Sequence, residues 1–166
     1  MVIGAFRCET QEFRYDVLDV KYFTHPQFRS KEYLKQASKI VFQLLAKLQI
    51  KKDEQIQICK GYIFDEAVDR LTEIYGGSRV NRIKVTGEPQ RLTEIAYLDE
   101  IRNLGYEPRE DRDEKKAKSF FHMMAWLERN PEKLTYAKTG WPRLQRYRLF
   151  RSHSRRHPIK NNEIGS

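Results

Sequence analysis

The hydrophobic positions near the N-terminus follow the two-residue period of β-strands. Residues 2–8 form a short apolar run, and residues 13–22 alternate between two faces, with a change of side near residue 18 that suggests a bulge or a strand covered on both faces. The polar stretch 9–12 between them is short enough for a hairpin turn. The sequence therefore predicts an antiparallel hairpin that ends at the Thr24-His25-Pro26 break.

A helical period replaces the strand pattern after residue 30. Apolar side chains repeat every three or four positions, and they predict a helix that begins with Ser30 as its cap and ends near Leu48. The residues of this apolar face are Tyr33, Leu34, Ala37, Ile40, Val41, Leu44, Leu45 and Leu48.

The middle of the chain alternates short strands with helices. The predicted elements are a strand at 56–59, a helix at 65–75 capped by Asp65, a strand at 79–85 and a helix at 86–104 with Pro89 in its first turn. Glycines at 76–77 and at 105 end the two helices. A fourth helix is predicted from Pro108 to Asn130, with charged first turns and an apolar second half.

The order of these elements, β-β-α-β-α-β-α, indicates the α/β fold class. We expect a mixed sheet in which the N-terminal antiparallel hairpin is followed by βαβα units, because strand–helix–strand connections favour parallel strands. The fourth helix and a basic C-terminal segment complete the chain. A length of 166 residues favours one domain, which we place at residues 1–150, followed by a basic, mobile tail at 151–166.

Positive charge is concentrated near the C-terminus. The chain has 32 Lys and Arg against 23 Asp and Glu, a net charge of +9. Residues 133–166 carry nine basic residues and one acidic residue, so they hold +8 of this charge. Aromatic side chains are interleaved with these arginines. Such an asymmetry suits a phosphate backbone, because each neutralised phosphate releases counterions.

We therefore expect an accessory nucleic-acid-binding protein that recognises the backbone with little sequence preference. The side chains expected to contact phosphates are Arg143, Arg146, Arg148 and Arg151, and those expected to stack on bases are Trp141 and Tyr147. The partner is RNA or DNA, and the sequence sets neither this choice nor the oligomeric state. Another anionic partner, or a tail that only solvates, is the simpler alternative.

Acidic side chains support a second hypothesis, a Mg²⁺- or Mn²⁺-dependent nuclease. Asp16 is predicted on the second strand, Asp65 after the third, and Glu94 and Asp99 on a helix that is apolar over most of its circumference. A carboxylate on an apolar helix face costs free energy unless it is paired, protonated or bound to a metal. We therefore expect Glu94 and Asp99 to be partly buried and to have partners. Under this hypothesis all four acids are catalytic and Mg²⁺ is the cofactor. The ordinary alternatives are a helix cap at Asp65 and an Asp99–Arg102 ion pair.

The hairpin followed by alternating helices and strands, together with these scattered acids, resembles the ribonuclease H-like nuclease architecture. The resemblance implies a nuclease in which Asp16, Asp65, Glu94 or Asp99 holds divalent metal ions. The acid that such a fold carries in the middle of its first strand is absent from residues 2–8.

Two strand-to-helix turns support a third hypothesis, a site for a small anion or ligand. Lys60-Gly61-Tyr62 and Thr86-Gly87-Glu88 each place a glycine between a strand and a helix N-terminus. Backbone N–H groups and the helix dipole favour an anion at such a place. The simpler interpretation is that both glycines serve tight turns only.

The composition of the chain also bears on its expected location in the cell. No run of about 18 apolar residues is present, so we expect no membrane partner. The first eight residues lack a basic region followed by a long apolar stretch, and we expect no signal peptide. Two cysteines, Cys8 and Cys59, are too few for a disulfide framework and are expected to be buried thiols. The sequence indicates a cytoplasmic protein.

Overall fold

The N-terminal strands form the predicted hairpin. The computed structural model describes residues 1–112 and 114–151. In it β1 (Val2–Arg7) and β2 (Glu12–Val17) are antiparallel, with Val2 opposite Val17 and Arg7 opposite Glu12. The second strand is shorter than the alternating stretch 13–22.

The second strand ends early because a short 3-10 helix follows it. This helix, η1 (Val20–Phe23), begins just after the alternation changes side, so the change marks the end of the strand and not a bulge. The carboxylate of Asp19 accepts a hydrogen bond of 2.9 Å from the backbone N–H of Lys21, which stabilises the turn. The turn carries Phe23 into the core, where it is 1% exposed.

The other two strands form a parallel pair. β3 (Ile56–Cys59) and β4 (Val80–Ile83) lie side by side, and the short helix η2 (Tyr62–Phe64) and α2 (Asp65–Tyr75) connect them. The α/β fold class and the predicted order of elements are therefore confirmed. In the part of the chain that the structure covers, the strands make two separate two-stranded sheets, β1–β2 and β3–β4, and hydrogen bonds do not join the two into one mixed sheet.

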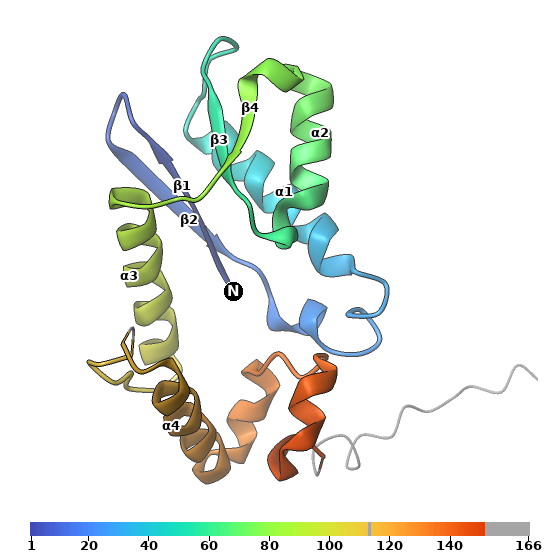
Figure 1. The fold of residues 1–166 in the computed structure, drawn as a ribbon, viewed down its shortest axis with the longest axis vertical. Helices are drawn as coiled ribbons and strands as arrows, with labels where there is room; N and C mark the ends of the chain where they lie inside the picture. The colour runs from blue at the N-terminus through green and yellow to red at the C-terminus, as the bar shows by residue number, and fades with distance from the viewer. Residues whose placement is uncertain (113, 152–166) are drawn as a thin grey trace, which may run out of the picture.

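One long helix organises the main hydrophobic core. α1 (Glu32–Lys47) packs against β1, β2 and α2, and α3 (Glu88–Asn103) packs against β1 and β2 (Figure 1). The helical period predicted for α1 is confirmed, because its apolar face supplies a large part of this core. The buried residues of the core are Ile3, Leu18, Phe23, Tyr33, Ala37, Ile40, Val41, Leu44, Ile56, Ile58, Ala67, Leu71 and Val80.

The two predicted helix caps are wrong. The hydroxyl of Ser30 donates to the carbonyl oxygen of Gln27 at 3.0 Å, and the residue before α1 is Lys31, in the left-handed region with φ 55°. Asp65 is the first residue of α2 and not its cap, and its carboxylate lies 2.8 Å from the guanidinium of Arg82 on β4. In both cases the side chain has found a partner other than the first N–H groups of its helix.

The fourth helix begins eight residues later than Pro108. α4 spans Lys116–Arg129, and local ion pairs organise the charged stretch before it. Arg109 donates two hydrogen bonds to Asp111, at 2.7 and 2.9 Å, and the ammonium of Lys115 lies 3.2 Å from the same carboxylate. These contacts hold the chain in turns, and α4 starts after them. Its predicted end at Asn130 is confirmed.

A second, smaller hydrophobic cluster lies in the C-terminal region, by which we mean residues 116–151. It is formed by α4, the 3-10 helix η4 (Pro131–Tyr136) and the residues after the 3-10 helix η5 (Pro142–Arg146). These segments lie at the bottom of the molecule in Figure 1. Its buried residues are Met124, Leu127, Leu134 and Phe150. Of the predicted tail at 151–166, residues 152–166 lie outside the described part, and the single domain at 1–150 stays a prediction.

Within residues 1–112 and 114–151, every helix is too short or too polar to cross a bilayer.

Candidate nucleic-acid interface

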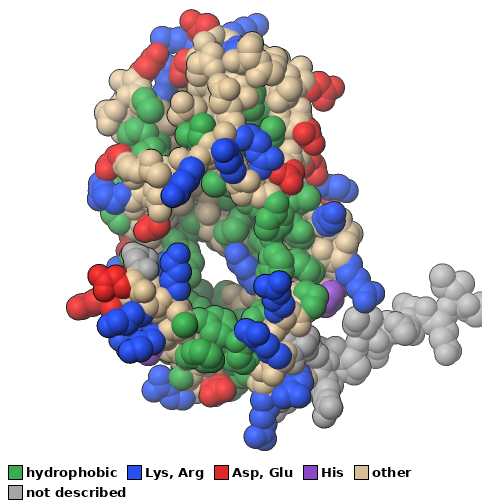
Figure 2. Space-filling view, in the orientation of Figure 1, with side chains coloured by type: hydrophobic (Ala, Val, Ile, Leu, Met, Phe, Trp, Pro, Cys, Tyr) green, Lys and Arg blue, Asp and Glu red, His purple; other side chains and the backbone are tan. Residues whose placement is uncertain are grey.

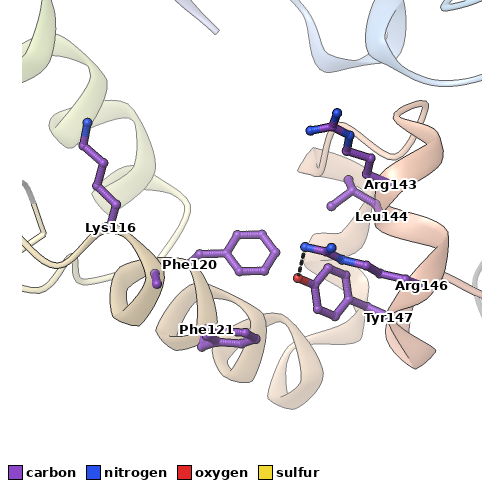
Figure 3. Close-up of a pocket in the computed structure, with 8 residues that line it drawn as sticks. Lys116, Phe120, Phe121, Arg143, Leu144, Arg146 and Tyr147 are labelled. Atoms are coloured by element: carbon purple, nitrogen blue, oxygen red, sulfur yellow. Dashed lines mark hydrogen bonds between the residues drawn. The ribbon is translucent and has the colours of Figure 1, made fainter.

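An open cavity of about 450 Å³ lies between α4 and η5. Figure 3 shows Lys116, Phe120 and Phe121 on one side, and Arg143, Leu144, Arg146 and Tyr147 on the other. We call this the basic–aromatic cavity. In the space-filling view of Figure 2 this face of the molecule is hollowed in its lower half, with Lys and Arg side chains along the edge of the hollow.

Three aromatic rings meet in the basic–aromatic cavity, Phe120 and Phe121 from α4 and Tyr147 from the opposite side. The ring centroids of Phe120 and Tyr147 are 5.4 Å apart, those of Phe121 and Tyr147 are 6.3 Å apart, and those of Phe120 and Phe121 are 5.4 Å apart. The rings are tilted or edge-to-face, with interplanar angles of 51° to 78°. Such pairs are favourable because the positive edge of one ring meets the negative face of the next.

Arg146 is held against the ring of Tyr147. Its guanidinium donates a hydrogen bond to the Tyr147 hydroxyl at 2.8 Å and lies 4.9 Å from the ring centroid. A hydroxyl leaves the positive charge of the guanidinium unneutralised, unlike a carboxylate partner. The contact therefore orients a cation at the cavity without cancelling its charge.

The remaining cations of the cavity have no acidic partner among the residues that the structure describes. Lys116 and Arg143 are exposed, and within the described chain neither forms an ion pair. Residues 133–151 contain six basic residues and no acidic residue. This stretch therefore carries a net charge of +6.

The structure brings together only part of the predicted set of six residues. Arg143, Arg146 and Tyr147 line the basic–aromatic cavity, whereas Arg148 and Arg151 are exposed on the same region outside its lining. Trp141 is half-buried, packed on Phe28 at 4.9 Å between ring centroids and on Tyr62 at 6.2 Å. Its packing joins the C-terminal region to the main core. Base stacking by Trp141 stays a prediction.

A second cavity, of about 290 Å³, continues along α4 and shares Lys116 and Phe120 with the first. Its lining adds Tyr97, Ile101, Tyr106, Pro108, Arg109, Arg112, Ser119 and Met123, and none of these is acidic. Arg112 lies 5.1 Å over the ring of Tyr97. Burial raises the pKa of the Tyr106 phenol, whose oxygen lies 2.9 Å from Nδ1 of His122.

The four acids of the nuclease hypothesis have separate partners. Asp16 accepts from the backbone N–H of Val17 at 2.7 Å, Asp65 pairs with Arg82, Glu94 accepts from Gln90 at 3.0 Å, and Asp99 lies 3.6 Å from Arg102. The Asp99–Arg102 pair is confirmed, but the expected burial of Asp99 is wrong, since 59% of its side chain is exposed. Glu94 is half-buried.

The described part of the chain contains no group of three or more His, Cys, Asp or Glu side chains placed to hold a metal ion. A nuclease site built on Asp16, Asp65, Glu94 and Asp99 therefore stays a prediction without a geometric argument for it. Of the two cysteines, Cys8 is exposed and Cys59 half-buried, so the expectation of two buried thiols is wrong.

Side chains occupy the first of the two glycine turns. The guanidinium of Arg82 donates to the carbonyl oxygens of Lys60 and Gly61, at 2.9 and 3.2 Å, while it pairs with Asp65. At the second turn Gly87 has φ 70°, a conformation that favours glycine whatever the turn binds. The contacts of Arg82 and the φ of Gly87 agree with the interpretation that these two glycines serve tight turns.

Sequence reasoning missed the α4 side of the cavity. Phe120 and Phe121 are adjacent in sequence, so they point about 100° apart on a helix and cannot both face the same core. Two neighbouring phenylalanines close to Lys116 in the sequence were therefore the signal that could have predicted an exposed aromatic site. The two phenylalanines are 36% and 57% exposed.

Comparison with known proteins yields no relative of this chain: no protein-family model, no curated protein and no solved structure matches it. Its function therefore has to be inferred from the chemistry of the cavity itself.

Proposed function

We propose that the protein is an accessory nucleic-acid-binding protein that contacts the phosphate backbone through the basic–aromatic cavity. One observation carries the proposal. Lys116, Arg143 and Arg146 gather around three aromatic rings in one open cavity whose lining contains no acidic residue.

This combination favours a polyanion with aromatic groups over a single small anion. Each basic side chain that reaches a phosphate releases condensed counterions, which is the main source of affinity for nucleic acids. The rings add contact area that phosphate alone would not use. Arg148 and Arg151, exposed on the same region, extend the positive surface beyond the cavity.

The salt dependence of binding tests this proposal. If Arg143, Arg146, Arg148 and Arg151 each contact one phosphate, the four together contribute roughly −3 to −4 to the slope of log K against log salt, from about −0.7 to −0.9 per contact. Replacing all four by Ala should remove most of the slope. The measurement is fluorescence anisotropy of a labelled oligonucleotide over a salt series.

A matched variant separates this effect from net charge. Replacing Lys39, Lys52, Lys60 and Lys84 by Ala removes the same charge from exposed positions outside both cavities, and it should leave the slope nearly unchanged. A thermal melt accompanies each titration. A strong fall in Tm for the arginine variant with an unchanged slope would contradict the proposal and make these arginines structural.

A further inference from the structure

We infer that the ligand of the basic–aromatic cavity is single-stranded nucleic acid, with at least one unpaired base stacked on the rings of Phe120, Phe121 and Tyr147. This inference rests on the proposed function and specifies its substrate class. It concerns how the cavity discriminates between single strands and duplexes, which phosphate contacts alone do not decide.

The exposure of the rings is the first step. Phe121 is 57% exposed and Phe120 is 36% exposed, although the apolar face of α4 buries Met124 and Leu127 in the C-terminal cluster. Two adjacent, exposed phenylalanines are costly to leave in water unless a ligand covers them. Every nucleobase has a flat face that can cover such a ring, whatever its sequence.

The position of the cations relative to the rings is the second step. Figure 3 shows Phe120 and Tyr147 pointing toward each other, with Lys116 on one side of the cavity and Arg143 and Arg146 on the other. A base that enters between these flanks brings its own two neighbouring phosphates toward opposite sides. The lining therefore matches a nucleotide within a chain, with charge at both flanks and aromatic surface in the wall.

A duplex fits this arrangement poorly. Its bases are stacked on one another inside the helix, so only its phosphates and groove edges reach a protein surface. The rings of the cavity would then stay uncovered. A base in a single strand is already free to turn outward, and it reaches the rings without first breaking a base pair.

The shape of the site argues against a bilayer surface as the ligand. Basic and aromatic residues also bind anionic lipids, but there the apolar side chains protrude and insert below the headgroups. Here the rings line the wall of a cavity of about 450 Å³ between cations. An anionic vesicle is included in the test as the competing surface.

The experiment compares wild type with F121L in anisotropy titrations. The probes are a labelled oligothymidylate of about 15 nucleotides, a length that spans typical single-strand sites, and a labelled duplex with the same number of phosphates. Leu keeps the apolar bulk of Phe121 and removes the aromatic face. We expect F121L to bind the single strand roughly 5- to 140-fold more weakly, from about 1–3 kcal/mol per stacked base. Its salt slope and its affinity for the duplex should be unchanged.

The matched control is Y136L. Tyr136 is an aromatic residue of the same region, 54% exposed, and lies outside the lining of both cavities. Its substitution should change neither affinity. F120L is the second test variant, and a thermal melt of each protein establishes that it is folded.

The outcomes distinguish this inference from the proposed function. Equal affinity of wild type for single strand and duplex, with a steep salt slope, overturns the single-strand inference and keeps nucleic-acid binding. Unchanged single-strand affinity in both F121L and F120L also overturns it. Binding to anionic vesicles without binding to either oligonucleotide overturns both. The single-strand inference and the proposed function are both supported if wild type prefers the single strand, F121L loses this preference and Y136L keeps it.

Discussion

Lys138 is a cation placed where water reaches it poorly. Burial lowers the pKa of its ammonium from the ordinary value of 10.5. The ammonium lies 4.4 Å from the ring centroid of Phe23, and no acid within the described chain forms an ion pair with it. Burial, together with the nearby charge of Lys138, lowers the pKa of the Met1 amine to about 6. The folded state thus pays a desolvation cost at this position for as long as Lys138 stays charged.

The pH dependence of stability reveals this cost. In the window just below pH 10.5, the unfolded chain keeps the proton of Lys138 while the folded chain has begun to lose it, so this residue makes stability rise with pH. Lys138→Met removes this contribution and leaves an apolar chain over Phe23. We expect the stability of wild type, relative to K138M, to rise from pH 8.5 toward pH 10.5, above the range in which the Met1 amine titrates. Urea unfolding at several pH values measures the difference. K39M, at an exposed site, should show no such trend.

At the scale of elements, α4 carries charges that oppose its own dipole. No acidic residue lies in its first turn, and Lys116 is its first residue. The N-terminus of a helix is its positive end, so exposed lysines there lower the stability of the helix. Sequence selected only for folding would favour Asp or Glu at these positions.

Lys116→Gln should therefore stabilise the protein and weaken binding at once. We expect a gain of about 0.3–1 kcal/mol in the free energy of unfolding, because the repulsion with the helix dipole is removed. We also expect the salt slope for an oligonucleotide to become less steep by about 0.7–0.9, because one phosphate contact is lost. Lys118→Gln is the control, since Lys118 lies in the same turn but lines neither cavity. It should give the stability gain alone. If the two variants have equal salt slopes, Lys116 does not contact the phosphate backbone.

The elements differ in how well the sequence predicts them, for physical reasons. α1 was predictable because sixteen residues repeat one apolar stripe, and that stripe has to be buried wherever the strands lie. The start of α4 was not predictable from Pro108, because Asp111 finds partners on both sides in Arg109 and Lys115. The division into two sheets was equally hidden, since β3 and β4 are four residues each and the choice of neighbouring strand depends on distant packing.

The sequence also predicts one side of the candidate site better than the other. Clustered charge in residues 133–151 pointed to Arg143, Arg146 and Tyr147, because net charge is a property of the sequence itself. The opposite wall comes from α4, and only the folded chain places it beside η5. Composition alone does not show that Trp141, an aromatic residue within this basic segment, packs on Phe28 and Tyr62.

For the whole molecule, the connection between the C-terminal region and the main core depends on Gly140. Its N–H donates to the carbonyl oxygen of Phe23 at 2.7 Å, next to the packing of Trp141 on Phe28. A Cβ at this position would lie 2.5 Å from that same oxygen and 2.6 Å from Cγ of Phe28. The first is the backbone oxygen of Phe23, a residue that is only 1% exposed, so it has little room to move.

Gly140→Ala should accordingly destabilise the protein by about 1–3 kcal/mol, the usual cost of inserting a methyl group into a packed interface. Gly61→Ala is the control, because its added Cβ would meet nothing closer than 3.8 Å. The basic–aromatic cavity is built within the C-terminal region, by α4 and the residues of and after η5, and not across this connection. We therefore expect G140A to lower Tm while its salt slope for a single strand, measured well below that Tm, stays that of wild type. A slope that falls together with Tm would show instead that contact with Phe23 and Phe28 is what holds Arg143 and Arg146 opposite α4.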